Sequence, residues 1–204
     1  MVQTNVITPE LLNAAMTYEE YRQLIDDLLA EGKTTGPKQS EAMTHYTEMN
    51  VTRMKRLDKR MKLNESLQLQ LAAIEVPQIW LVISEGWCGD AAQTVPIMAA
   101  MANESANIEM KLILRDDNLE VMDAYLTNGA RAIPKLIILD ANTLEELGTW
   151  GPRPAPAQEL LYEYKSNPDE TYAEFSKRLQ IWYARDKTQT TQQELEGLLK
   201  VLNQ

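Results

Sequence analysis

Residues 79–90, with the sequence IWLVISEGWCGD, decide the fold of this chain. The first five are apolar and favour β structure, which predicts a strand buried on both faces of a sheet. The run 91–103 that follows has a helical pattern. Cys88, the single cysteine of the chain, is therefore expected in the turn that leads from a strand into a helix.

Alternating and helical patterns continue on both sides of this stretch. Further strands are expected at 108–114, 135–139 and 144–150, with a helix at 119–126 and a turn at 140–143. Helices are expected before the stretch at 17–31, 40–61 and from Asn64 to before Pro77, and after it near Pro156, at 169–185 and from Thr191. Thr191 and Glu194 have the spacing of a capping box.

The element order over 76–150 is β-α-β-α-β-β, which predicts an α/β core with a central mixed sheet flanked by helices. We expect three segments: an N-terminal helical extension at 1–75, the core at 76–167, and C-terminal helices at 168–204 that pack on the core. The Met- and Leu-rich stripes of the extensions need burial, so the extensions should pack on the core as one unit.

Composition limits the classes of function. The 204 residues are 44% hydrophobic and 25% charged, as in a globular protein. The net charge of −10 disfavours nucleic acid as a partner, and no apolar stretch approaches the ~20 residues that span a bilayer. Residues 1–10 show no signal-peptide pattern, so we expect a cytoplasmic protein that keeps its thiol reduced.

The position of Cys88 suggests a reactive thiol. A helix N-terminus stabilises a thiolate, so the pKa of Cys88 is expected below the ordinary value of about 8.5. Trp87 and Gly89 favour a tight and partly exposed turn. Asp90 and Glu85 place carboxylates nearby, and these should keep the pKa well above that of the most activated thiols.

The segment 87–91 (WCGDA) resembles the active-site segment of the thioredoxin superfamily. Pro96 resembles the proline that kinks the active-site helix of that family, and Gly148 has a counterpart in its last strand. Ile133 and Pro134 resemble its cis-proline segment, which lies beside the nucleophile and pairs with the substrate backbone. The resemblance covers about 76–165 and implies a thioredoxin-like fold.

The chain departs from the family where a second cysteine would stand. Ala91 occupies the position of the resolving cysteine, and Val82 occupies that of the buried acid which assists it. A two-cysteine exchange cycle is therefore excluded. The Cys-Gly-Phe-Ser signature of monothiol glutaredoxins is also absent, which argues against glutathione and iron–sulfur roles.

Two functions remain open. In the first, Cys88 is the nucleophile of a monothiol mechanism that forms a mixed disulfide with a protein or low-molecular-weight disulfide, and a second thiol releases it. Trp87, Gly89, Asp90, Ile133 and Pro134 would then hold the substrate. In the second, the fold is a redox-inactive binding or chaperone-like module. An intermolecular disulfide through Cys88 is a third option, and the oligomeric state stays open.

Outside this segment, few residues suggest chemistry. No cofactor or metal is expected, because one cysteine and one histidine, His45, do not make a zinc site. The basic run 53–62 is either a solvated helix face or a docking surface for an acidic partner or a phosphate. Trp80 is expected to lie in the core, and Trp150 and Trp182 are expected either to pack or to line a groove.

Overall fold

The computed structural model describes residues 6–204. Met1–Asn5, the first half of the segment in which no signal peptide is expected, lie outside the described residues. The strands are β1 (Gln78–Ser84), β2 (Ile108–Leu114), β3 (Lys135–Asp140) and β4 (Glu146–Trp150). The helices are α1 (Pro9–Ala14), α2 (Tyr18–Ala30), α3 (Glu41–Arg60), α4 (Glu65–Ala72), α5 (Ala91–Glu104), α6 (Leu119–Ala124), α7 (Ala155–Ser166), α8 (Tyr172–Asp186) and α9 (Gln189–Leu202).

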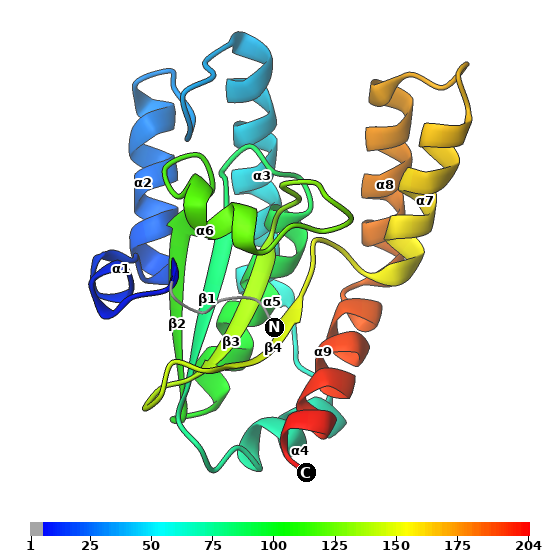
Figure 1. The fold of residues 1–204 in the computed structure, drawn as a ribbon. Helices are drawn as coiled ribbons and strands as arrows, with labels where there is room; N and C mark the ends of the chain where they lie inside the picture. The colour runs from blue at the N-terminus through cyan, green and yellow to red at the C-terminus, as the bar shows by residue number, and fades with distance from the viewer. Residues whose placement is uncertain (1–5) are drawn as a thin grey trace.

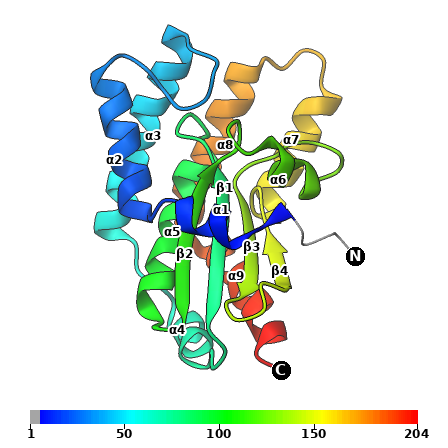
Figure 2. The same cartoon turned by 60° about the vertical axis from the view of Figure 1, so that its left-hand side comes forward.

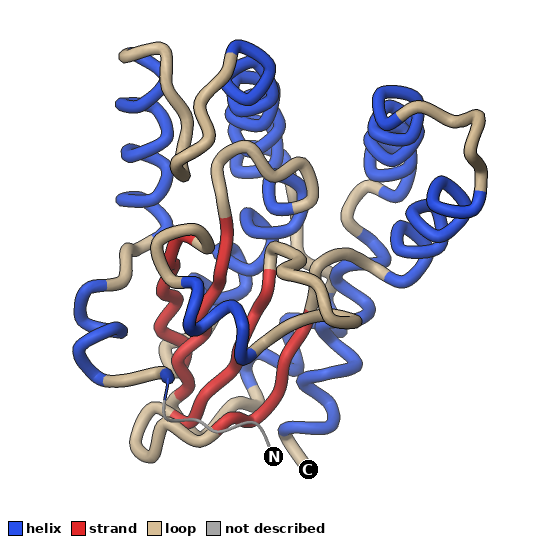
Figure 3. Tube along the Cα trace, turned by 45° about the horizontal axis from the view of Figure 1, so that its top comes forward, coloured by secondary structure: helices blue, strands red, loops and turns tan. Residues whose placement is uncertain are grey.

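The strands form one mixed sheet in the order β2-β1-β3-β4. β1 is parallel to β2 and antiparallel to β3, and β3 is antiparallel to β4. Every residue of β1 is buried, as expected for a central strand that is covered on both faces. This confirms the predicted α/β core, which Figure 3 shows as a central group of strands surrounded by helices.

Helices cover both faces of the sheet. In Figure 1, α6 lies in front of the strands and α5 lies behind them, and α3, α4 and α9 pack against α5. Figure 2 shows α1 crossing the face opposite α5. Helices α7 and α8 form a hairpin beside the sheet (Figure 1). Among residues 6–204, none of the helices combines the length and apolarity needed to cross a bilayer.

One hydrophobic cluster joins all three predicted segments. It contains Leu12 and Ile25 from the N-terminal helices, Trp80 from the sheet, and Leu195 and Leu199 from α9. A second, smaller cluster lies inside the α7–α8 hairpin and contains Ala157, Phe175, Leu179 and Tyr183. The division of the chain into the segments 1–75, 76–167 and 168–204 remains a prediction.

Some predicted boundaries were confirmed, and others were wrong for local reasons. The third helix, α4, ends at Ala72, before Pro77 as predicted. The last strand begins at Glu146, because Leu144 has a φ of 59° in the turn before it. Thr191 does not cap a helix: α9 starts at Gln189, with Thr188 at its N-cap.

Candidate functional site

Cys88 lies in the turn between β1 and α5, as the sequence predicts. The N–H of Ala91 donates to its Sγ at 3.5 Å, and the thiol donates to the carbonyl oxygen of Ile133 at 3.3 Å. The peptide bond between Ile133 and Pro134 is cis. The structure therefore brings together the two segments, 87–91 and 133–134, that carried the resemblance.

The expected activation of Cys88 is wrong. Its side chain is buried, with the residue 8% exposed, although Trp87 and Gly89 on either side of it are partly exposed. Burial raises the pKa of Cys88 to about 12, and the carboxylate of Asp90 adds to the increase. The N–H groups of Ala91 and Asp90 favour the thiolate, but desolvation outweighs them.

Asp90 is a buried carboxylate that binds two side chains from the C-terminal part of the chain. Arg153 donates to its Oδ2 from Nε at 3.0 Å and from Nη2 at 2.6 Å. Tyr183 in α8 donates its hydroxyl to Oδ1 at 2.7 Å. Such charge-assisted bonds are among the stronger ones in proteins. Through Asp90, these bonds connect the start of α5 to the segment that follows β4 and to the α7–α8 hairpin.

The Ile133–Pro134 segment, with which a substrate backbone would pair, is covered by another part of the chain. Ile133 and Pro134 are both buried. Gly151, with a φ of 120°, lies so close that an added Cβ would stand 2.3 Å from the carbonyl oxygen of Pro134. The chain after β4 therefore occupies the surface above Pro134.

Trp87 and Gly89 are the more accessible residues of the segment. The guanidinium of Arg115 lies 4.7 Å from the ring centroid of Trp87, a cation–π geometry. Gly89 faces α8, because an added Cβ would stand 3.0 Å from Nε2 of Gln180. Gln93 Nε2 in turn donates to Gln180 Oε1 at 2.7 Å, so α8 also binds the first turns of α5.

A cavity of about 360 Å³ opens beside Trp87 and Gly89. We call it the Trp87 cavity. It carries aromatic, cationic and apolar side chains from α3, from α8 and from the loops at the end of the sheet. The lining residues are Lys38, Met43, Tyr46, Asn50, Arg53, Trp87, Gly89, Arg115, Asp116, Tyr172, Ser176 and Gln180. Its single acidic residue within the described chain, Asp116, is paired with Arg115 at 2.8 Å.

Glu85 is a second buried acid near Cys88. Its Oε1 accepts the N–H of Asp116 at 2.9 Å, and its Oε2 has no hydrogen-bond partner among residues 6–204. Burial raises the pKa of Glu85, and the Asp116 carboxylate contributes. The carboxylate of Glu85 is therefore only partly satisfied by hydrogen bonds within residues 6–204.

Comparison with known proteins decides the family. A family model described as thioredoxin matches residues 36–179, which is more than half of the chain. The chain belongs to this thioredoxin family. No curated protein matches it.

Two solved structures share the fold of this thioredoxin-family chain. A protein of unknown function, PA1234 from Pseudomonas aeruginosa, is 16% identical with a TM-score of 0.61, over 94% of this chain and 95% of that one. An HIV epitope-scaffold is 18% identical with a TM-score of 0.53, over 91% and 98%. At these identities the likeness shows the fold alone, and the coverage includes the helical additions.

Two functional neighbours of the thioredoxin-like segment were not predicted. Arg153 and Tyr183 lie 63 and 93 residues from Asp90, so no local spacing connects them to it. The acid at position 90 was the available signal, because a carboxylate beside a helix start needs a partner when it is buried. The remaining predicted site residues all lie around Cys88.

The remaining candidates from the sequence are His45, the basic run 53–62 and Trp80, and each has the environment of an ordinary surface or core residue. His45 is exposed and pairs with Glu48 at 3.7 Å, and no metal-binding group of acids, histidines and cysteines occurs in the described part of the chain. In the basic run 53–62, Met54 and Leu57 are buried, while Arg56, Arg60 and Lys62 are exposed. Trp80 is fully buried, as expected.

Proposed function

We propose that this thioredoxin-family chain is a redox-inactive binding module that holds an acidic, aromatic-bearing segment of a partner protein in the Trp87 cavity. The burial of Cys88, with its pKa raised to about 12, carries this proposal. A thiol with that pKa is almost wholly protonated at neutral pH, and a protonated thiol is a poor nucleophile.

The chemistry of the Trp87 cavity supports the choice of ligand. Arg53 pairs with no carboxylate among the described residues, and its guanidinium donates to Asn50 Oδ1 at 2.7 Å. Burial lowers the pKa of Arg53, followed by the effect of Arg56, so an incoming carboxylate would relieve an unfavourable charge. Trp87 and Tyr172 offer aromatic surfaces for a ring or an apolar side chain.

The first test is the alkylation rate of Cys88 as a function of pH. We expect the native chain to react with iodoacetamide at pH 7.5 at least about 100-fold more slowly than the unfolded chain, because the thiolate population is so small. The rate should still be rising at pH 10. Cys88→Ser is the blank, and mass spectrometry gives the modified fraction. A fast thiol with an apparent pKa near 7 would overturn the redox-inactive proposal.

Ligand binding is tested with a fluorescent peptide. The probe is an acidic peptide with one tyrosine. Its charge-reversed counterpart carries lysine in place of each acid. We expect anisotropy to show binding of the acidic peptide only. Arg53→Gln should weaken binding at least about tenfold, whereas Lys59→Gln, an exposed residue of the same helix outside the cavity, should not. Equal binding of both peptides would contradict the proposal.

A second candidate function, monothiol exchange, is favoured by one observation. Cys88 Sγ accepts the N–H of Ala91 beside cis-Pro134, the position that the resemblance assigns to a nucleophile. The thiolate would attack one sulfur of a substrate disulfide, form a mixed disulfide and release the other sulfur as a thiolate. A second thiol would then attack the mixed disulfide and regenerate Cys88.

This candidate requires the covering segment to move away from Cys88. Incubation of the native chain with a small aromatic disulfide tests it directly, with intact-mass measurement of the mixed disulfide. A stoichiometric adduct within seconds at pH 7.5 would favour monothiol exchange over the binding module. An adduct that forms only in denaturant would exclude it.

A further inference from the structure

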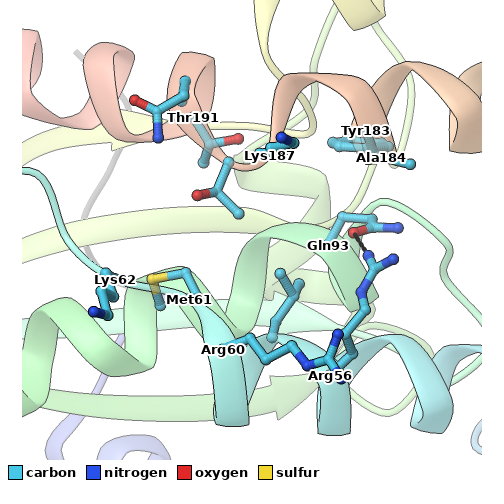
Figure 4. Close-up of a pocket in the computed structure, with 12 residues that line it drawn as sticks. Arg56, Arg60, Met61, Lys62, Gln93, Tyr183, Ala184, Lys187 and Thr191 are labelled. Atoms are coloured by element: carbon cyan, nitrogen blue, oxygen red, sulfur yellow. Dashed lines mark hydrogen bonds between the residues drawn. The ribbon is translucent and has the colours of Figure 1, made fainter.

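A second cavity lies further along α8 than the Trp87 cavity, toward the C-terminal end of that helix, and the proposed function does not use it. Its volume is about 520 Å³, within the range of small-molecule sites. It lies between the C-terminal half of α3 and the junction of α8 with α9, as Figure 4 shows. The lining residues are Arg56, Leu57, Arg60, Met61, Lys62, Gln93, Tyr183, Ala184, Lys187, Thr188, Gln189 and Thr191.

The charge of this cavity is one-sided. Arg56, Arg60, Lys62 and Lys187 line it, and no acidic residue of the described chain does. None of the ion pairs found between described residues includes any of these four side chains. The whole chain has a net charge of −10, so the positive charge around this cavity is opposite in sign to the net charge of the protein.

Two of these cations are close neighbours on α3. Arg56 and Arg60 are four residues apart on α3 and share one helix face, where like charges repel. Arg56 reaches only a long contact of 3.5 Å with Oε1 of Gln93. An anion between the two guanidinium groups would remove the repulsion and accept the paired N–H donors that an arginine presents.

The α9 side of the cavity adds neutral donors. The N-terminus of α9 begins at Gln189, and Thr188 at the N-cap makes no side-chain capping bond, although Asp186 accepts the N–H of Thr190. Thr191 is 1% exposed, lines the cavity, and its hydroxyl has no hydrogen-bond partner within residues 6–204. The Asp186 carboxylate already accepts the N–H and the hydroxyl of Thr190 at the start of α9, so the hydroxyl of Thr191 is the donor that this side leaves for an anion.

We propose that this cavity binds a small molecule with two or more linked phosphate groups. Four cations match the charge of a diphosphate, and Leu57 and Met61 provide apolar surface for an organic group attached to it. The phosphates bind between Arg56, Arg60 and Lys187, with the hydroxyl of Thr191 as a further donor. The negative charge of the whole chain disfavours a long nucleic acid at the same place.

Calorimetry on the full chain tests the proposal with inorganic pyrophosphate and with ADP. We expect both to bind at low salt and to bind more weakly as NaCl is raised. Equal affinities assign recognition to the phosphates alone, and tighter binding of ADP adds a contact of its organic part. No detectable binding of either at millimolar concentration would overturn the proposal, as would binding of an oligonucleotide alone.

Paired variants of α3 separate the cavity from general charge. The double variant Arg56→Gln with Arg60→Gln should weaken pyrophosphate binding at least about tenfold. The matched control, Lys55→Gln with Lys59→Gln, removes the same charge from neighbouring exposed positions outside the cavity. It should weaken binding no more than about twofold. An equal loss in both doubles would show nonspecific attraction and overturn the site.

Thr191→Val tests the neutral donor. Valine keeps the size of the side chain and removes the hydroxyl, so the fold should be retained. Pyrophosphate affinity should fall several-fold, and thermal unfolding without ligand should stay the same or rise, because a buried unpartnered hydroxyl is lost. Unchanged affinity would remove Thr191 from the site.

Discussion

The two buried carboxylates near Cys88 differ in how fully hydrogen bonds satisfy them. Asp90 is buried but fully bonded, to Arg153 and Tyr183. Glu85 is buried with one oxygen unpartnered among the described residues. A satisfied carboxylate stabilises the native chain, whereas a partly satisfied one lowers its stability. The same local segment therefore contains one acid that holds the structure together and one that works against it.

Glu85→Gln should stabilise the protein at neutral and higher pH. In the unfolded chain this carboxyl ionises near its ordinary value of 4.5, and in the folded chain burial raises its pKa. Between those two values the folded state holds a proton that the unfolded state has lost. The free energy of unfolding of the native protein should therefore fall as pH rises through that window.

Urea unfolding at pH 4 and pH 8 measures this effect. The variant should be about 1 kcal/mol more stable than the native chain at pH 8, and the difference should shrink at pH 4, where Glu85 is protonated. Glu159→Gln, at an exposed position of α7, is the control. A Glu85→Gln variant that is less stable at pH 8 would show that the ionised carboxylate is favourable.

Among the elements, the α7–α8 hairpin is the one that covers the site. Its hydrophobic cluster is separate from the main core, and it stands beside the sheet (Figure 1). Its polar connections to the start of α5 are the bond from Tyr183 to Asp90 and the bond between Gln180 and Gln93. Elements with few core contacts open at lower free energy than the core does.

Tyr183→Phe should therefore loosen the hairpin without unfolding the sheet. We expect faster hydrogen exchange in 155–186 and a several-fold faster alkylation of Cys88, with a loss of global stability of about 1 kcal/mol. Tyr164→Phe removes a hydroxyl from the same hairpin that makes no bond to Asp90, and it should leave both rates unchanged. Equal exchange in the two variants would show that Tyr183 does not hold the hairpin.

Elements with a clear periodicity were predictable from sequence, and long-range contacts were not. The apolar run 79–83 correctly located β1, and the helical pattern at 17–31 correctly located α2. The short helix α1 was missed, although Thr8 caps it and Pro9 begins it. At the site, motifs located Cys88 and Pro134, but the pKa of the thiol depends on burial by distant segments that local sequence does not report.

For the whole molecule, the main core is shared by both ends of the chain. Leu67 and Leu71 in α4 belong to the same cluster as Leu195 and Leu199 in α9. Polar bonds connect the same elements: Ser66 donates to Glu196 at 2.8 Å, and Asn203 donates to the carbonyl of Gln70 at 3.0 Å. The central segment is thus covered by residues that lie outside it.

A fragment limited to 76–167 should not fold by itself. Removing both extensions exposes the face of α5 that α3, α4 and α9 cover, and a buried leucine contributes about 1.5–3 kcal/mol. Far-UV circular dichroism and urea unfolding of the fragment check this, with the full chain as reference. A cooperative unfolding transition of the isolated fragment would contradict the prediction and support independent domains.

The pairing of α4 with α9 has a consequence for synthesis on the ribosome. Chains emerge from the N-terminus, and domains generally fold as units as they are made. Leu67 and Leu71 leave the ribosome long before Leu195 and Leu199 exist to cover them. The nascent protein therefore carries an uncovered apolar surface until α9 has been made, and chaperones that hold such surfaces should bind it before α9 emerges and release it once α9 has packed.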